Sequence, residues 1–261
     1  MLPLTPREKL LRALRVPVPL RRAMGSVPNS PQSELSESIK LLMRGSAQSV
    51  AVIAAFMPHK ADSSKYIHAA TLSSFTTVSL APPLVAFSLR LPSRLADALR
   101  AGVMEHCILS PSVSAAMPTD KPHFLIHLLS QSQQSVSNYF ARPGVPPLRV
   151  GDKVSPGNPF VEHKTTPSRA VEGMHVLDES LGAFACSLVS QIDLTSPDLH
   201  GTMFTTPADG AHAEEKGSAL FIARINSVEH ADGKGGIMPM LAHDRKPLVY
   251  CRQKYGTIAL P

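Results

Sequence analysis

Short apolar segments rich in β-branched and aromatic residues recur along most of this 261-residue chain, and they constrain the fold more than any other feature. They stand at 49–56, 65–75, 82–90, 123–130, 182–195, 218–230 and 247–258. Segments of this length and composition are typical of β-strands. Helical patterns cover only short stretches such as 93–102, where Leu95, Ala98 and Leu99 share one face and Gly102 closes the helix, and 133–144. Six or seven strands with so few helices predict an antiparallel β-barrel or β-sandwich.

The first 38 residues differ in composition and are expected to form a basic leader and flexible linker, with the folded domain at 39–261. Residues 1–24 are basic and leucine-rich with Glu8 as the only acid, a composition typical of a mitochondrial presequence. Four prolines weaken the helix that such a signal needs, so an untargeted leader on a cytoplasmic protein is the alternative. Residues 25–38 are predicted to be a linker, with Ser36 or Ser38 capping a short helix that ends before Gly45.

Charge and cysteine content argue against several classes of function. The net charge is +6, but six of the basic residues lie in the leader: Arg7, Lys9, Arg12, Arg15, Arg21 and Arg22. Without zinc-finger spacing or an RNA-binding motif, nucleic acid is not an expected partner. The three cysteines are too far apart for a disulfide scaffold or a zinc site, and the histidines lack metal-ligand spacing. No run of about 18 uncharged apolar residues predicts a membrane span.

The most informative segment runs from Ala70 to Arg94 and places a hydroxyl-rich run between two predicted strands. The run contains Thr71, Ser73, Ser74, Thr76, Thr77 and Ser79. Hydroxyl and free backbone N–H groups form a nest for a phosphate. Arg94 adds a charge-assisted contact, and the helix that begins near Ser93 adds the positive end of its dipole. The alternative is a serine-rich hairpin loop whose hydroxyls bond to neighbouring backbone groups.

The same segment, ATLSSFTTVSLAPPLVAFSLRLPSR, closely resembles the flavin reductase-like family, whose members carry TVSSFTSVSL, then PPLV and a strand followed by PSR. Three further segments resemble the family in the same order: SVAVIAAF (49–56), HFLIHLLSQSQQSVSNYFARPG (123–144) and PLVYCRQKYG (247–256). The resemblance covers roughly residues 40–258. It implies a mainly β fold, an antiparallel Greek-key split β-barrel that binds FMN and has a few short flanking helices.

The resemblance also implies roles for individual residues. Positions expected to line the flavin ring and ribityl chain are Thr71, Leu72, Ser73, Ser74, Ser88, Leu89 and Arg90, while Ser93 and Arg94 match the phosphate contacts. Arg252 and Tyr255 match positions near the nicotinamide. For these two a structural alternative stays open, because Tyr255 also fits closure of the barrel and Arg252 fits a solvated strand charge. No residue is expected to act as a catalytic acid, base or nucleophile.

The activity that the resemblance implies is NAD(P)H-dependent reduction of FMN, with FAD as the alternative flavin and NADH or NADPH as electron donor. It also implies a homodimer, and it allows a partner monooxygenase. The alternatives are an FMN-binding protein without reductase turnover and a split-barrel flavin oxidase or oxygenase.

The chain departs from the family pattern in four places. Ala69 stands at the family's glycine, His127 at its asparagine, and Gly217-Ser218 where many members have an Asp-His pair. Residues 104–120 are an extra segment, while 142–173 are predicted to be a long loop and 195–217 a polar insertion. A lone histidine on a strand more often has a structural role than a catalytic one. Ala69 and the Gly217-Ser218 pair support the alternative that binds flavin without nicotinamide turnover.

Overall fold

The computed structural model describes residues 31–58, 66–109, 121–150, 158–194, 217–230 and 245–258. The chain divides into two compact units, Met1–Met43 and Arg44–Pro261. Most of helix α2 (Pro31–Arg44) belongs to the first unit, and the predicted leader at 1–24 lies outside the described residues. Because proline suits the first turn of a helix, α2 begins at Pro31, inside the predicted linker. The predicted start at Ser36 or Ser38 is therefore wrong, whereas the end before Gly45 is confirmed.

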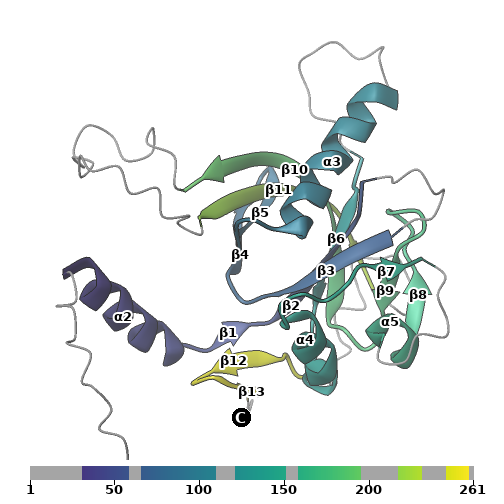
Figure 1. Cartoon of the computed structure of the whole chain (residues 1–261). Coiled ribbons are helices and arrows are strands. Elements are labelled where there is room, and N and C mark those ends of the chain that lie inside the picture. The colour runs from purple at the N-terminus through teal and green to yellow at the C-terminus, as the bar shows by residue number, and fades with distance from the viewer. Residues whose placement is uncertain are drawn as a thin grey trace, which may run out of the picture. The chain divides into compact units, whose positions relative to one another are not determined.

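The second unit consists mainly of antiparallel strands with a few helices (Figure 1). Its strands are β1 (Gln48–Ser49), β2 (Ala51–Phe56), β3 (Tyr66–Leu72), β4 (Phe75–Leu80), β5 (Pro83–Arg90), β6 (Phe124–Leu128), β7 (Leu148–Arg149), β8 (Thr165–Pro167), β9 (His175–Leu177), β10 (Gly182–Asp193), β11 (Ser218–Glu229), β12 (Val249–Cys251) and β13 (Lys254–Gly256). Its helices are α3 (Arg94–Leu109), the short 3-10 helix η1 (Gln131–Gln133), α4 (Gln134–Phe140) and α5 (Pro159–Glu162). This composition confirms the mainly β fold class.

One eight-stranded sheet organises the second unit. Its strand order is β4-β5-β11-β10-β6-β2-β3-β7, and every neighbouring pair is antiparallel. Strands far apart in the chain are neighbours, as expected for a Greek key. The long strands β10 and β11 pair along most of their length (Figure 1). Strand β6 pairs with the first part of β10, and β5 pairs with the first part of β11.

Both faces of the sheet are buried, which explains why the central strands are apolar at nearly every position. In β2, alternate residues point to opposite faces: Ile53 packs into one core and Ala54 into the other. Helix α3 covers the first core, where the rings of Phe87 and Phe221 stack with centroids 5.5 Å apart. The second core contains Val136 and Phe140 of α4.

Three sequence predictions about local structure are wrong. The hydroxyl-rich run is not one loop, because residues 75–80 form strand β4. Helix α3 continues past Gly102 to Leu109. A Cβ atom at Gly102 would lie 2.4 Å from Cδ2 of His123, so glycine is needed there for close packing and not to end the helix. The predicted long loop at 142–173 contains β7, α5 and β8.

Candidate functional site

The residues that the resemblance assigns to flavin and nicotinamide lie on strands β3, β5 and β13, in the β3–β4 bend and the β12–β13 turn, and at the start of helix α3. Thr71, near the end of β3, donates its hydroxyl hydrogen to the carbonyl oxygen of Ser137 in α4, 2.7 Å away. The Ser137 hydroxyl donates to the phenol oxygen of Tyr255 in β13, at 2.8 Å. Ser137 therefore links Thr71 and Tyr255 by hydrogen bonds, although these two residues are far apart in the sequence.

The bend between β3 and β4 consists of Ser73 and Ser74. The Ser74 hydroxyl lies 3.0 Å from the hydroxyl of Ser88 in β5, so the hairpin joins two of the predicted flavin residues. Ser74 is exposed, and Ser73 and Ser88 are half-buried. These hydroxyls are accessible to a ligand that lies along the bend.

Leu72 and Leu89 have a different role. Both side chains are buried in the core that α3 covers, so only their backbone groups are able to face a ligand. Arg90 is exposed at the end of β5, opposite Ser218 of β11. The sequence pattern thus assigned two core leucines to the flavin together with the accessible serines.

Ser93 and Arg94 form the start of helix α3. The Ser93 hydroxyl accepts from the backbone N–H of Ala96 at 3.3 Å, which caps the helix. The exposed Arg94 side chain donates from Nη2 to the carbonyl oxygen of Val145 at 2.9 Å. Because a guanidinium has five N–H donors, this contact leaves several for an anion.

Arg94 also affects the electrostatics of strand β3. Burial, and then the positive charge of Arg94, lower the pKa of His68, whose Nδ1 is buried without a hydrogen-bond partner among the described residues. From His68 to Leu72, the last residue of β3 before the bend, is four strand positions, roughly 13 Å at about 3.3 Å per residue. Exposed hydroxyls thus lie at one end of β3 and a guanidinium at a helix N-terminus beside its other end, a donor set that fits a phosphorylated flavin.

Arg252 lies apart from these groups. It occupies the turn of the β12–β13 hairpin, where Arg252 and Gln253 have φ values of 50° and 62°. Two successive residues with positive φ are typical of a type I′ turn. The Arg252 side chain is exposed, and within the described ranges it makes no hydrogen bond or ion pair with the predicted flavin residues.

His127, at the family's asparagine position, is fully buried in β6. Its ring nitrogens face two carbonyl oxygens, Nε2 that of His175 at 3.1 Å and Nδ1 that of Val52 at 3.3 Å. Burial lowers its pKa despite these two contacts, so the ring is neutral and has one N–H to donate. These contacts support a structural role for His127, as the sequence suggested.

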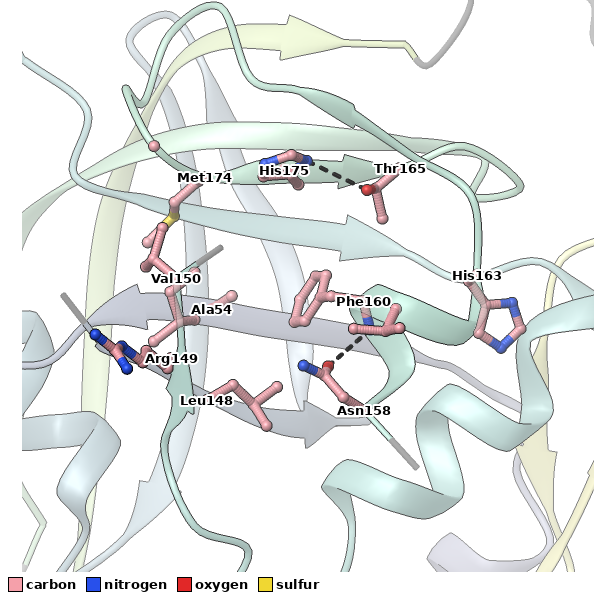
Figure 2. Close-up of a pocket in the computed structure, with 13 residues that line it drawn as sticks. Ala54, Leu148, Arg149, Val150, Asn158, Phe160, His163, Thr165, Met174 and His175 are labelled. Carbon is pink, nitrogen blue, oxygen red and sulfur yellow. Dashed lines mark hydrogen bonds between the residues drawn. The ribbon is translucent and has the colours of Figure 1, made fainter. Parts of the chain in front are cut away.

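The sequence did not predict a cavity of about 390 Å³ that lies between β2, β3, β7, α5 and the β8–β9 hairpin (Figure 2). Its walls include Ala54, Ile67, Leu148, Asn158, Phe160 and Met174, and none of the predicted site residues line it. A signal was present: Asn158 followed by Pro159 is a helix start, with the Asn158 side chain accepting from the Phe160 N–H. The cavity wall itself comes from distant segments that no local pattern connects.

The described part of the chain was searched for metal-binding clusters and for membrane-spanning helices. In those ranges no group of His, Cys, Asp or Glu side chains is placed to hold a metal ion. Searched over the same residues, the helices are all too short or too polar to cross a membrane.

Comparison with solved structures shows the fold. The styrene monooxygenase flavin reductase of Pseudomonas putida S12 matches with a TM-score of 0.51 and 19% identity, over 86% of this chain and 99% of that chain. The NADH:FAD oxidoreductase SgcE6 of Streptomyces globisporus matches with a TM-score of 0.53 and 13% identity, over 88% and 95%. Nitrilotriacetate monooxygenase component B of Mycobacterium thermoresistibile matches with a TM-score of 0.51 and 17% identity, over 87% and 89%. These likenesses confirm the split-barrel fold.

Comparison with protein families gives one match, the flavin reductase like domain, at residues 43–259. The match includes every described strand and the whole candidate site. The chain therefore belongs to the flavin reductase-like family.

Proposed function

We propose that this protein is an NAD(P)H-dependent flavin reductase that binds FMN, with FAD as the alternative flavin. Membership of the family supports flavin chemistry. The observation that carries the proposal is the exposed Arg94 guanidinium at the capped start of α3, beside the strand whose far end presents Thr71 and Ser74. A positively charged group for the phosphate thus lies beside one end of β3, and neutral hydroxyl groups lie at its other end.

The chain's own residues bind and orient the reactants in this proposal. Arg94 and Ser93 hold the phosphate, while the Ser74 and Ser88 hydroxyls and the backbone of 71–74 hold the ribityl chain and ring edge. Tyr255, whose phenol oxygen accepts from the Ser137 hydroxyl, would lie near the nicotinamide. A bound flavin would supply the redox chemistry, as an acceptor of hydride from the nicotinamide. No general acid or base is required of the protein.

The second candidate function is flavin binding without reductase turnover. At the position of the family's Asp-His pair, Gly217 has no side chain, and its carbonyl oxygen accepts from the Leu91 N–H at 2.8 Å. This backbone contact ties the start of β11 to the end of β5, and Ser218 offers only a hydroxyl where the family pattern has a histidine.

Two measurements test the proposal. Purified protein is expected to show the visible absorption bands of bound flavin and to accelerate NADH or NADPH oxidation when FMN is added. Bound flavin without nicotinamide oxidation would support the second candidate. Substrate-dependent oxygen uptake without NAD(P)H would indicate an oxidase or oxygenase. Failure to bind either FMN or FAD would refute all three candidate functions.

Assembly and location are further parts of the proposal. Two of the matched structures are named as components of monooxygenases, which supports a partner monooxygenase as the acceptor of the reduced flavin. A homodimer follows from the family resemblance, and sedimentation measurements test it. Mitochondrial import through residues 1–24 is tested by N-terminal sequencing of the protein isolated from cells.

A further inference from the structure

The cavity between β2, β3, β7, α5 and the β8–β9 hairpin has the size and lining of a small-molecule site. Its volume of about 390 Å³ falls in the range typical of ligand pockets. Ile67, Leu148, Phe160 and Met174 supply apolar walls. In Figure 2 the Phe160 ring lies opposite Ala54 and Val150 across the open space. Such walls favour a compact apolar or aromatic ligand.

One polar group is held in a fixed orientation at this cavity. The Asn158 side chain is 3% exposed, and its Oδ1 accepts from the Phe160 N–H at 3.0 Å. Since only the oxygen accepts, this bond fixes which end of the amide is the nitrogen. The nitrogen points toward the Leu148 side of the cavity (Figure 2), and within the described ranges it has no hydrogen-bond partner. This nitrogen is not one of the fully buried side-chain atoms that lack a partner, so a ligand or a water molecule in the cavity can reach it and accept its hydrogen bond.

The charges around the cavity select the kind of acceptor. None of the thirteen lining residues is acidic, and Arg149 lies at the outer edge with its guanidinium pointing away from the centre. Three other polar lining side chains are already paired: Thr165 with His175 at 3.2 Å, and His163 with Ser135 at 3.0 Å. Among the described lining residues a cation therefore has no counter-charge, whereas a neutral or anionic oxygen acceptor has the Asn158 amide.

We propose that this cavity binds a compact aromatic molecule of one or two rings, and that the Asn158 amide recognises a carbonyl or carboxylate oxygen on it. The site is distinct from the proposed flavin site, because none of the residues assigned to flavin line the cavity. The proposal does not depend on flavin reductase activity.

The test uses fluorine NMR titration of the full chain with two probes, 4-fluorobenzoate and fluorobenzene, which differ in the acceptor group. We expect saturable binding of both, with 4-fluorobenzoate at least about tenfold tighter, as one charge-assisted hydrogen bond provides. Asn158→Asp keeps the oxygen that caps α5 but replaces the donor with a negative oxygen. This variant is expected to lose the preference for 4-fluorobenzoate and to keep fluorobenzene binding.

Two variants make the result specific. Asn138→Asp makes the same chemical change at an exposed position of α4 outside the cavity, and it is expected to leave both affinities unchanged. Ala54→Leu fills the cavity from β2 and is expected to abolish binding of both probes. 4-Fluorobenzamide distinguishes the acceptors: affinity equal to that of the benzoate identifies a neutral carbonyl ligand, and weaker affinity identifies a carboxylate.

Three results would overturn the proposal. The first is the absence of saturable binding of any probe at millimolar concentration. The second is binding that Asn158→Asp and Ala54→Leu both leave unchanged while circular dichroism shows them folded. The third is competitive displacement of 4-fluorobenzoate by FMN, which would make the cavity a part of the flavin site. FMN binding or its absence, measured without the probes, has no bearing on the cavity.

Discussion

Replacing Arg94 with alanine tests the proposed phosphate site directly. Arg94 is exposed, and one of its N–H groups is already donated to Val145, so we count one charge-assisted hydrogen bond to the phosphate and not a full bidentate pair. Such a bond contributes about 1.5–3 kcal/mol. At about 1.4 kcal/mol per factor of ten, Arg94→Ala should weaken FMN binding roughly 10- to 150-fold. Salt should reduce the effect, because the contact lies at the surface.

Parallel fluorescence titrations with FMN and riboflavin measure this effect. Riboflavin lacks the phosphate, so its affinity should be the same for the wild-type protein and Arg94→Ala. Arg100→Ala is the matched control, since Arg100 is an exposed arginine of the same helix that pairs with Asp97 at 2.9 Å. Unchanged FMN affinity would mean that the phosphate binds elsewhere. An equal loss for riboflavin would mean that Arg94 supports the fold of the site and does not contact the phosphate.

Three further predictions concern stability. Phe87→Ala removes a ring that is 1% exposed. Urea titration should show the free energy of unfolding lowered by about 3–5 kcal/mol. A loss below about 1 kcal/mol would contradict the place of Phe87 in the core that α3 covers. Gly102→Ala should destabilise by about 1–3 kcal/mol because the new Cβ meets the His123 ring, whereas a raised melting temperature would show that helix propensity dominates. Burial lowers the pKa of His127 in the folded protein, so at acidic pH this side chain is protonated more readily in the unfolded chain than in the folded one. The free energy of unfolding should therefore fall as the pH drops below about 6.5. In His127→Asn the free energy of unfolding should depend less on pH. A pH profile identical to that of the wild-type protein would refute this role of His127.

The strands were predictable because their signal is local. Segments 182–195 and 218–230 carry enough apolar and β-branched residues to identify β10 and β11, and the family pattern located β3 and β5. The helix ends were less predictable. Gly102 looks like a helix terminator in sequence, but here it makes room for His123, which the chain brings alongside from beyond an extra segment.

The candidate site was predictable only in part. The motif identified Ser74, Ser88 and Arg94, which have accessible polar groups, but also Leu72, whose side chain belongs to the core. The motif is a continuous run of residues, whereas side chains alternate between the two faces of a strand. It therefore includes residues with accessible side chains together with neighbours whose side chains lie in the core. Ser137 was missed altogether, since its role depends on α4 packing against β3.

The departures from the family pattern differ in their structural consequences. Ala69 lies within β3 at 4% exposure and has no positive φ, so the loss of the glycine strains no backbone there. Its methyl group packs in the second core, while the hydroxyl of Thr71 still reaches α4. The glycine at 217 is a different case, because the change removes a side chain and leaves only a backbone contact to Leu91. We therefore expect flavin binding and nicotinamide use to be separable in this chain, because Ala69 leaves the backbone of β3 unstrained whereas Ser218 stands at the position of the family's histidine.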